Sequence, residues 1–237
     1  TTGAWTYTLG AAAQALAAGQ IVTESFTATV SDGLGGTAEQ TVTLTVTGSN
    51  DGPVIDTGTS VLAGSVIEND APMASGTLLS SDTDVGAGAV WTGAAAGTYG
   101  AFTINATTGA WTYTLGAAAE ALDPGQVVTE SFTATVTDDT NATASTTVQI
   151  TVTGTNDVPV VTSDTAAAQG AVTEDSDPVA SGQLTANDAD AGAVLNWTGS
   201  ADGTYGAFTI NATTGAWTYT LGAAAQALAA GQIVTES

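Results

Sequence analysis

A repeat of 106 residues constrains this chain more than any other feature of its sequence. The opening text, TTGAWTYTLGAAAQALAAGQIVTES (1–25), returns unchanged at residues 213–237. A version that differs at four positions occupies residues 107–131, one period from each. Roughly 100 residues is the usual size of one compact β-sandwich, so the period predicts one such domain per repeat.

Runs of Gly, Asn-Asp and Pro mark the edges of the repeat, because they end one strand and hold the next segment extended. These runs are GSNDGPV (48–54) and GTNDVPV (154–160). They predict the C-terminal part of a repeat at 1–51, a complete repeat at 52–157, and a repeat without its last strands at 158–237. The identical ends then form a window on a longer array. In the alternative, strands like residues 26–47 of a neighbouring copy complete the last repeat in trans.

Alternation of apolar and hydroxyl side chains predicts the strands. In TVTLTVTG (41–48), Val42, Leu44 and Val46 share one face, which is typical of a half-buried antiparallel strand. YGAFTI (99–104) and AWTYTL (110–115) flank NATTG and predict a hairpin with a five-residue loop.

Turn-rich and Ala-rich text separates these strands. SDGLGGTAEQ (31–40) predicts a longer Gly-rich loop, and GAAAQALAAGQ (10–20) predicts a turn or two of helix. Seven or so short strands per repeat predict an all-β fold of tandem immunoglobulin-like β-sandwiches.

Composition excludes several classes of function. The chain has 23 acidic residues and no Lys, Arg, His or Cys. Nucleic acid and anionic membranes are excluded as partners because they need cationic side chains, and no 18-residue apolar run supports membrane insertion. Disulfides and thiolate metal sites are also excluded. Only carboxylates and Tyr remain for acid–base chemistry, so we predict that the chain is not an enzyme.

Carboxylates recur with the period where a metal ion needs them. Each linker carries an Asn-Asp pair, and an Asp-x-Asp motif follows the linker Asp after 31 residues. Calcium prefers six to eight oxygen ligands from carboxylates and carbonyls. The sequence therefore predicts Ca²⁺ at each linker. The residues are Asn50, Asp51, Asp82 and Asp84, and then Asn156, Asp157, Asp188 and Asp190.

Three further acids are weaker candidates for the same role. They are Asp138, in a hairpin loop, and the repeated pair Glu68 and Glu174. The alternative for every candidate is a solvated turn residue, since Asp and Asn are common in turns. We favour that alternative for Glu120 and Asp123, because the outer copies carry Gln and Ala there.

Trp91 and Trp197 follow the Asp-x-Asp loops. We predict that both lie in the core, as sandwiches of this type commonly bury one Trp. In the alternative, exposed aromatic rings stack on sugars, and the chain is a carbohydrate- or surface-binding module.

The motifs together resemble the VCBS repeat of very large bacterial surface and biofilm proteins, often RTX-type adhesins. They are GTYGAFTINATTGAWTYTL, QALAAGQIVTESFTATVSDGLGGTAEQTVTLTVTGSNDGPV and AVTEDSDPVASGQLTANDAD, and they span nearly the whole chain. The resemblance implies cadherin-like sandwiches in tandem, export to the cell surface or biofilm matrix, and calcium between domains.

It implies ligands in the linkers and in the Asp-x-Asp loops, with Asp138 joining the first junction and Glu68 reaching the second from the preceding domain. Gly52 and Val158 stand where cadherin linkers often carry a further Asn, so the resemblance does not fix the number of ions. The implied function is a calcium-rigidified extender module of a long extracellular adhesin or filament. Its partners would be neighbouring repeats and other copies in a fibre, with any glycan or surface ligand bound elsewhere in the parent protein.

Overall fold

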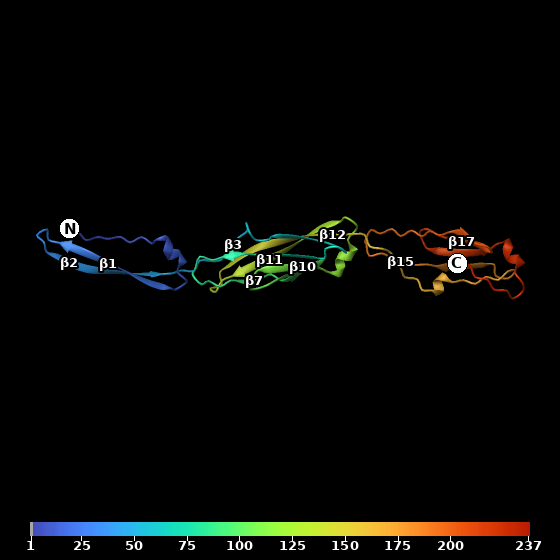
Figure 1. Ribbon diagram of the computed structural model, residues 1–237, viewed down its shortest axis with the longest axis horizontal. Coiled ribbons are helices and arrows are strands. Elements are labelled where there is room, and N and C mark those ends of the chain that lie inside the picture. The colour runs from blue at the N-terminus through green and yellow to red at the C-terminus, as the bar shows by residue number, and fades with distance from the viewer. Residues whose placement is uncertain (1) are drawn as a thin grey trace. The chain divides into compact units, whose positions relative to one another are not determined.

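Two long hairpins of alternating Thr and apolar residues have the same register one period apart. In the computed structural model, which describes residues 2–237, β1 (Ile21–Ser31) pairs antiparallel with β2 (Thr37–Thr47). β11 (Val127–Thr137) pairs in the same way with β12 (Thr143–Thr153) (Figure 1). The predicted strand alternation is confirmed by β12, where Val148, Ile150 and Val152 are buried.

The predicted ten-residue Gly-rich loop at 31–40 is wrong, because the loop holds only residues 32–36. The Asp32 Oδ1 atom accepts bonds from the N–H groups of Leu34 (2.8 Å) and Gly36 (2.9 Å). Gly33 and Gly35 adopt positive φ of 74° and 100°, which glycine tolerates without strain. The tight loop leaves the residues from Thr37 onward free to pair with β1.

The described residues divide into two compact units. The first contains the chain up to Ala119 together with Val127–Thr153, and the second contains Glu120–Gln126 together with Gly154–Ser237. In each unit the strands alternate with turns and short 3₁₀ helices, and the fold is all-β as predicted.

Beyond β1 and β2, the first unit is a β-sandwich of two four-stranded sheets, with orders β5-β10-β9-β8 and β4-β12-β11-β7. Among the described strands of this unit, only β4 runs parallel to its neighbour, β12. A further short pair joins β3 to β6. The bounds of the strands not yet given are β3 Val54–Ile55, β4 Ala63–Ile67, β5 Met73–Thr77, β6 Ser80–Ser81, β7 Val90–Thr92, β8 Ala95–Ala96, β9 Gly100–Ile104 and β10 Ala110–Leu115.

Aromatic side chains join the two sheets. The ring of Phe132 on β11 stacks on Phe102 at a centroid distance of 5.1 Å and contacts Tyr113 at 5.6 Å. Trp111, also on β10, is 1% exposed. The predicted hairpin is confirmed, because β9 pairs antiparallel with β10 and the NATTG loop joins them, with Asn105 Oδ1 accepting from the N–H of Thr108 (2.9 Å).

The second unit contains one four-stranded sheet, of order β14-β18-β17-β16, and a short pair of β13 with β15. The strand bounds are β13 Val160–Val161, β14 Val179–Gln183, β15 Ala186–Asn187, β16 Ala201–Asp202, β17 Gly206–Ile210 and β18 Ala216–Leu221. Phe208 and Trp217 contact across β17 and β18, at a centroid distance of 5.9 Å.

The Ala-rich stretches form short 3₁₀ helices, in line with the predicted turn or two of helix. They are η1 Ala11–Ala15, η2 Ala117–Ala121 and η4 Ala223–Ala227, and a further one, η3, spans Ala166–Ala168. Within residues 2–237, no helix is long and apolar enough to cross a membrane.

Candidate metal centre

The first linker site consists of Asn50, Asp51, Asp82, Asp84 and Asp138, all in the first unit. Two hydrogen bonds fix its frame. The Asp51 N–H donates to Asp84 Oδ2 (3.0 Å), and the Asp84 N–H donates to Asp82 Oδ1 (2.9 Å). The first of these bonds ties the linker backbone to a side chain of the Asp-x-Asp loop, and the second closes a turn within that loop.

Asp138 joins this site through Asn50. The Asn50 Nδ2 donates to Asp138 Oδ2 (2.9 Å), while Asp138 Oδ1 accepts the N–H groups of Thr140 (2.9 Å) and Ala142 (2.8 Å) in its own loop. The Asn50 amide, and after it these loop bonds, hold the pKa of Asp138 below its ordinary value despite desolvation. Asp138 is therefore ionised at neutral pH, with one oxygen committed to the loop.

The first linker site contains buried carboxylate oxygens that have no hydrogen-bond partner. Asp84 is 8% exposed, and both Asp84 Oδ1 and Asp82 Oδ2 are buried with no donor. A buried charge without a partner is costly, and removal of a counter-charge is strongly destabilising. Because the chain has no Lys, Arg or His, no cationic side chain can balance them.

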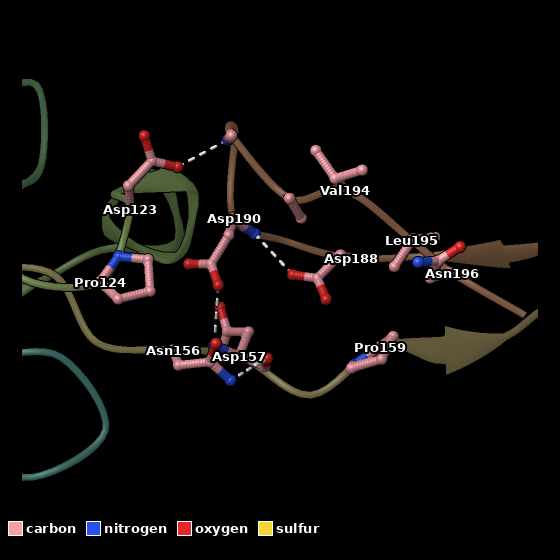
Figure 2. A pocket seen from close by; sticks show the side chains of 12 residues that line it. Asp123, Pro124, Asn156, Asp157, Pro159, Asp188, Asp190, Val194, Leu195 and Asn196 are labelled. Carbon is pink, nitrogen blue, oxygen red and sulfur yellow. Dashed lines mark hydrogen bonds between the residues drawn. The ribbon is translucent and has the colours of Figure 1, made fainter. Parts of the chain in front are cut away.

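The second linker site consists of Asn156, Asp157, Asp188 and Asp190, all in the second unit, and repeats this frame. The Asp157 N–H donates to Asp190 Oδ2 (3.1 Å), and the Asp190 N–H donates to Asp188 Oδ1 (3.0 Å). Figure 2 shows Asp190 joined to both. Asn156 differs from Asn50, because its Nδ2 donates to the Asp157 carbonyl (2.6 Å). Asp190 is 7% exposed, and its Oδ1 is buried without a partner.

A pocket of about 450 Å³ lies at the second linker site, and Asp123 and Pro124 line it together with the four predicted residues (Figure 2). The Gly192 N–H donates to Asp123 Oδ1 (2.6 Å), and the Ala191 N–H donates to the Ala121 carbonyl (3.3 Å). Carboxylate oxygens of Glu120 and Asp157 lie within 4.8 Å of each other.

Asp123 does not fit the expectation that it is merely solvated, because it is half-buried and accepts the Gly192 N–H, whereas Glu120 is exposed as expected. Sequence reasoning set them aside because Gln14 and Ala17 replace them one period earlier. The available signal was their position in or just after η2, which with η1 we call the crossover helices. The backbone of each crossover helix contacts an Asp-x-Asp loop: just as the Ala191 N–H donates to the Ala121 carbonyl, the Val85 N–H donates to the Ala15 carbonyl (3.1 Å). Residues that vary between copies can thus change a site whose frame stays constant.

Glu68 and Glu174 occupy equivalent turns. Glu68 is fully buried after β4, and its N–H donates to the Thr153 carbonyl (3.0 Å). Glu174 lies in the turn closed by the backbone bonds between Thr173 and Asp177 (2.8 and 2.9 Å), and its Oε2 is buried without a partner. Glu174 does not line the pocket at the second linker site.

The two Trp residues that follow the Asp-x-Asp loops have different environments. Trp91, on β7, is 4% exposed, which confirms the expectation that it lies in the core and leaves no ring face for a sugar. Trp197 is half-buried.

The donor chemistry of both linker sites fits calcium. Every side chain offers oxygen from a carboxylate or a carboxamide, and three of those oxygens are buried without a donor, namely Asp82 Oδ2, Asp84 Oδ1 and Asp190 Oδ1. Calcium takes such hard oxygen ligands at 2.3–2.6 Å in irregular geometry, whereas Zn²⁺ and Cu²⁺ favour nitrogen or sulfur. These residues form a frame in which a cation could take the place of the missing donors.

Three solved structures are similar to the chain at low identity. Mouse cadherin-23 EC22-24 is 18% identical, with 83% of this chain and 63% of that chain covered and a TM-score of 0.43. Human CDH23 EC21-23 is 20% identical over 84% and 64%, with a TM-score of 0.43. PcdhgB3 EC1-4 is 15% identical over 85% and 49%, with a TM-score of 0.47. The chain thus spans 49% to 64% of their lengths, and no curated protein matches it.

A family match covers the sandwich of the first unit. Residues 50–154 match the bacterial cadherin-like domain family. This stretch contains β3 to β12, and with them both four-stranded sheets and every residue of the first linker site. The fold of this stretch is cadherin-like.

Proposed function

We propose that the chain is a structural extender module of a long extracellular bacterial adhesin or matrix filament, of the VCBS or RTX type, and that calcium at its linkers makes it rigid. The family match to a bacterial cadherin-like domain supports the structural role. Tandem sandwiches joined by short linkers provide length, and a site that recurs with the repeat suits architecture better than catalysis.

One observation carries the calcium proposal. Buried carboxylate oxygens of Asp82, Asp84 and Asp190 have no hydrogen-bond donor, in a chain that has no cationic side chain. At neutral pH a cation from solution is the available counter-charge.

Calcium would act on the linker through charge and geometry. Asp51 and Asp157 belong to linkers, and their backbones already bond to Asp84 and Asp190 in the loops. An ion shared by linker and loop carboxylates would turn mutual repulsion into attraction and lock these segments together. Without the ion, the same carboxylates repel, and the linkers loosen.

Thermal unfolding with and without calcium tests the proposal. Saturation about 1,000-fold above Kd stabilises a folded protein by about 4 kcal/mol. For a chain of this size that corresponds to a rise in Tm of about 10 °C. Magnesium at the same concentration should have a much smaller effect, because it dehydrates reluctantly and demands octahedral geometry.

A matched pair of variants separates specific binding from general charge screening. The double variant Asp84→Asn and Asp190→Asn keeps side-chain oxygen acceptors for the linker N–H groups but removes two charges. It should lose most of the calcium-induced rise in Tm. The control Glu39→Gln and Asp202→Asn removes two charges from exposed strand positions and should keep the rise. An equal response in both variants, or an unchanged Tm in excess chelator, would refute specific calcium binding.

Hydrogen exchange tests the stiffening itself. Calcium should increase the protection of amides in residues 154–159 and 188–193, the linker and loop of the second linker site, by at least about tenfold. If calcium binds but the hydrogen-exchange protection of these amides does not change, calcium is a ligand that does not stiffen the linker.

A further inference from the structure

A hollow of about 810 Å³ opens at one edge of the sandwich in the first unit. One wall is the segment 93–99, which carries β8 and crosses from one sheet to the other, and the second wall is residues 129–133 of β11. Both walls lie within residues 50–154, the stretch that matches the bacterial cadherin-like domain family. Clefts of about 300 to 1,000 Å³ are typical of small-molecule sites in proteins.

Backbone contacts close the hollow at both ends. At one end Gly93, with a φ of 141°, lies so close to β11 that a Cβ atom there would be 2.5 Å from the Thr133 carbonyl oxygen. At the other end Glu130 Oε1 accepts the N–H groups of Thr98 (2.5 Å) and Tyr99 (3.1 Å). The strand between these two contacts spans only about 10 Å. The hollow is therefore too short for a peptide that pairs along β11, and it suits a compact ligand.

Small residues keep the hollow open. The five residues 93–97 of the first wall are all glycine or alanine, and Ala94, Ala95 and Ala96 are exposed. A Cβ atom at Gly97 would lie 2.5 Å from Glu130 Oε1, so a larger residue there would displace the carboxylate. The space that longer side chains would fill thus stays accessible to a ligand.

Tyr99 gives the hollow an aromatic ring on a fixed backbone. Its N–H donates to Glu130, and its carbonyl accepts the Gly116 N–H (2.8 Å). Its side chain is half-buried, and among residues 2–237 it has no aromatic partner and no side-chain hydrogen bond. The core uses Phe102 and Tyr113 instead, both of which contact Phe132. The Tyr99 ring is therefore available to a ligand.

Hydroxyl residues line the opposite wall. Thr129, Ser131 and Thr133 are exposed, and their hydroxyl groups make no hydrogen bond within the part of the chain that the structure describes. A sugar has an apolar ring face and a rim of hydroxyl groups. An aromatic ring on one wall and free hydroxyl groups on the other complement both of these features.

We propose that this hollow binds a neutral oligosaccharide, with one sugar ring on Tyr99 and hydrogen bonds from that sugar to the β11 wall. The ligand is neutral because the chain has 23 acidic residues and no Lys, Arg or His to pair with a carboxylate, sulfate or phosphate group. The hollow shares no residue with either linker site. The proposal therefore goes beyond the extender function and does not depend on calcium.

The key residues of the hollow recur with the period. Tyr99 and Glu130 correspond to Tyr205 and Glu236, and the Tyr205 N–H donates to Glu236 Oε1 (2.9 Å). An array of such repeats would carry this site at intervals of 106 residues. Many weak contacts with one polysaccharide would then add up to firm attachment through multivalency.

Titration of the 237-residue chain with cellopentaose, laminaripentaose and maltopentaose, followed by nuclear magnetic resonance, tests the proposal. At least one of these neutral glucans should shift the amide resonances of Gly97, Tyr99 and Ser131, with a Kd of about 1 mM for an open site with one ring. Trigalacturonic acid should bind at least about tenfold more weakly because of charge repulsion. No shift with any of the three glucans, shifts confined to other residues, or equal binding of the acid would overturn the proposal.

A matched pair of variants tests the role of the ring. Tyr99→Ala should weaken binding at the hollow at least about tenfold, as does loss of an aromatic anchor. Tyr205→Ala removes the equivalent ring of the second unit and should change this Kd less than about twofold. The amide resonances of β10 report whether the sandwich of the Tyr99→Ala chain is folded. Equal weakening by the two variants would overturn Tyr99 as the anchor.

A filled hollow tests the location even if the Tyr99→Ala chain does not fold. Ala94 is exposed and lies between β7 and β8, outside both strands, so Ala94→Trp should leave the fold intact. Its indole ring should occupy the hollow and weaken glucan binding at least about tenfold, although Tyr99 is still present. Unchanged or stronger binding would show that any exposed ring suffices and would overturn the hollow as the site. All these titrations are done in excess chelator, so their outcome is separate from that of the calcium proposal.

Discussion

The two linker sites share a frame and differ in charge. In both, the linker Asp N–H bonds to the second Asp of the Asp-x-Asp loop, at 3.0 Å for Asp51 and 3.1 Å for Asp157. In both, the N–H of the residue that follows the second Asp donates to a carbonyl of the preceding 3₁₀ helix. The Val85 N–H donates to Ala15 (3.1 Å), and the Ala191 N–H donates to Ala121 (3.3 Å). The backbone scaffold is thus independent of the acids around it.

The difference in charge between the two sites comes from the residues in and just after the 3₁₀ helices η1 and η2. The second linker site has Asp123 in its pocket and Glu120 near Asp157, whereas Ala17 and Gln14 stand at these positions one period earlier. Calcium affinity depends on the number of charged ligands and on the rigidity of the site. We therefore expect the second linker site to bind calcium more tightly, so that an array loads its junctions in order as calcium rises.

The largest effect should follow loss of the central carboxylate of either site. Asp84→Asn should weaken calcium binding at the first linker site by at least about 100-fold, because a buried oxygen without a partner is then no longer charged. Asp190→Asn should do the same at the second linker site alone. Calorimetric titration, with the amide resonances of Val85 and Ala191 as site reporters, measures both constants. If either variant lowered affinity at both sites equally, the sites would not be independent.

A smaller effect should follow removal of the additional acid at the second linker site. Asp123→Ala should lower calcium affinity there by about tenfold, equivalent to about 1.4 kcal/mol, and leave the first linker site unchanged. Asp123→Asn is the control, since it keeps an acceptor for the Gly192 N–H and removes only the charge. If Asp123→Asn binds calcium as well as the unmodified chain, Asp123 acts as a tether and not through its charge.

The converse change should reduce the difference in calcium affinity between the two linker sites. Ala17→Asp together with Gln14→Glu gives the first crossover the acids of the second, and should raise calcium affinity at the first linker site by about tenfold or less. The gain should be smaller than the loss from Asp84→Asn, because η1 has no buried residue and holds its side chains less firmly. Unchanged affinity at the first linker site would show that the crossover acids do not act on the ion.

The strands that depend on local pairing could be predicted from the sequence. The NATTG hairpin and the Thr-Val alternation specify neighbours a few residues apart, and the β1–β2 register forms even where the hairpin lacks a covering sheet. The short strands β4 and β7 could not be predicted. They pair with β12 and β11, and without that hairpin residues 169–172 and 196–198 form no strand.

The candidate site likewise has residues that could be predicted from the sequence and residues that could not. The linker and Asp-x-Asp residues recur with the period, and hydrogen bonds join them in both units. Asp123 was missed because variation between copies suggested that it is dispensable, and because its contact with Gly192 joins residues 69 positions apart. Only the fold brings the crossover next to the loop.

The smallest effect should come from Asp138, whose loop role has an internal control in Asp32 one period earlier. Both carboxylates accept two N–H groups in their own loops. These bonds hold the pKa of Asp32 below the ordinary value of 3.8, and at Asp138 they add to the larger lowering of the pKa by the Asn50 amide. Asp138→Asn should therefore change calcium affinity at the first linker site by less than about threefold, because one of its oxygens is already committed to the loop.

Acid titration in chelator separates the loop role of Asp138 from its contact with the linker. A carboxyl with a lowered folded-state pKa stabilises its loop above the ordinary value, and that stability is lost as the pH falls through the lowered one. Asn50 is the largest cause of the lowered pKa of Asp138 and plays no part at Asp32. Asn50→Ala should therefore raise the midpoint at which the Ala142 amide resonance shifts and leave that of Gly36 in place. Equal midpoints in the variant and the unmodified chain would show that the linker does not reach Asp138 in solution, which would leave Asp138 a residue of its loop alone.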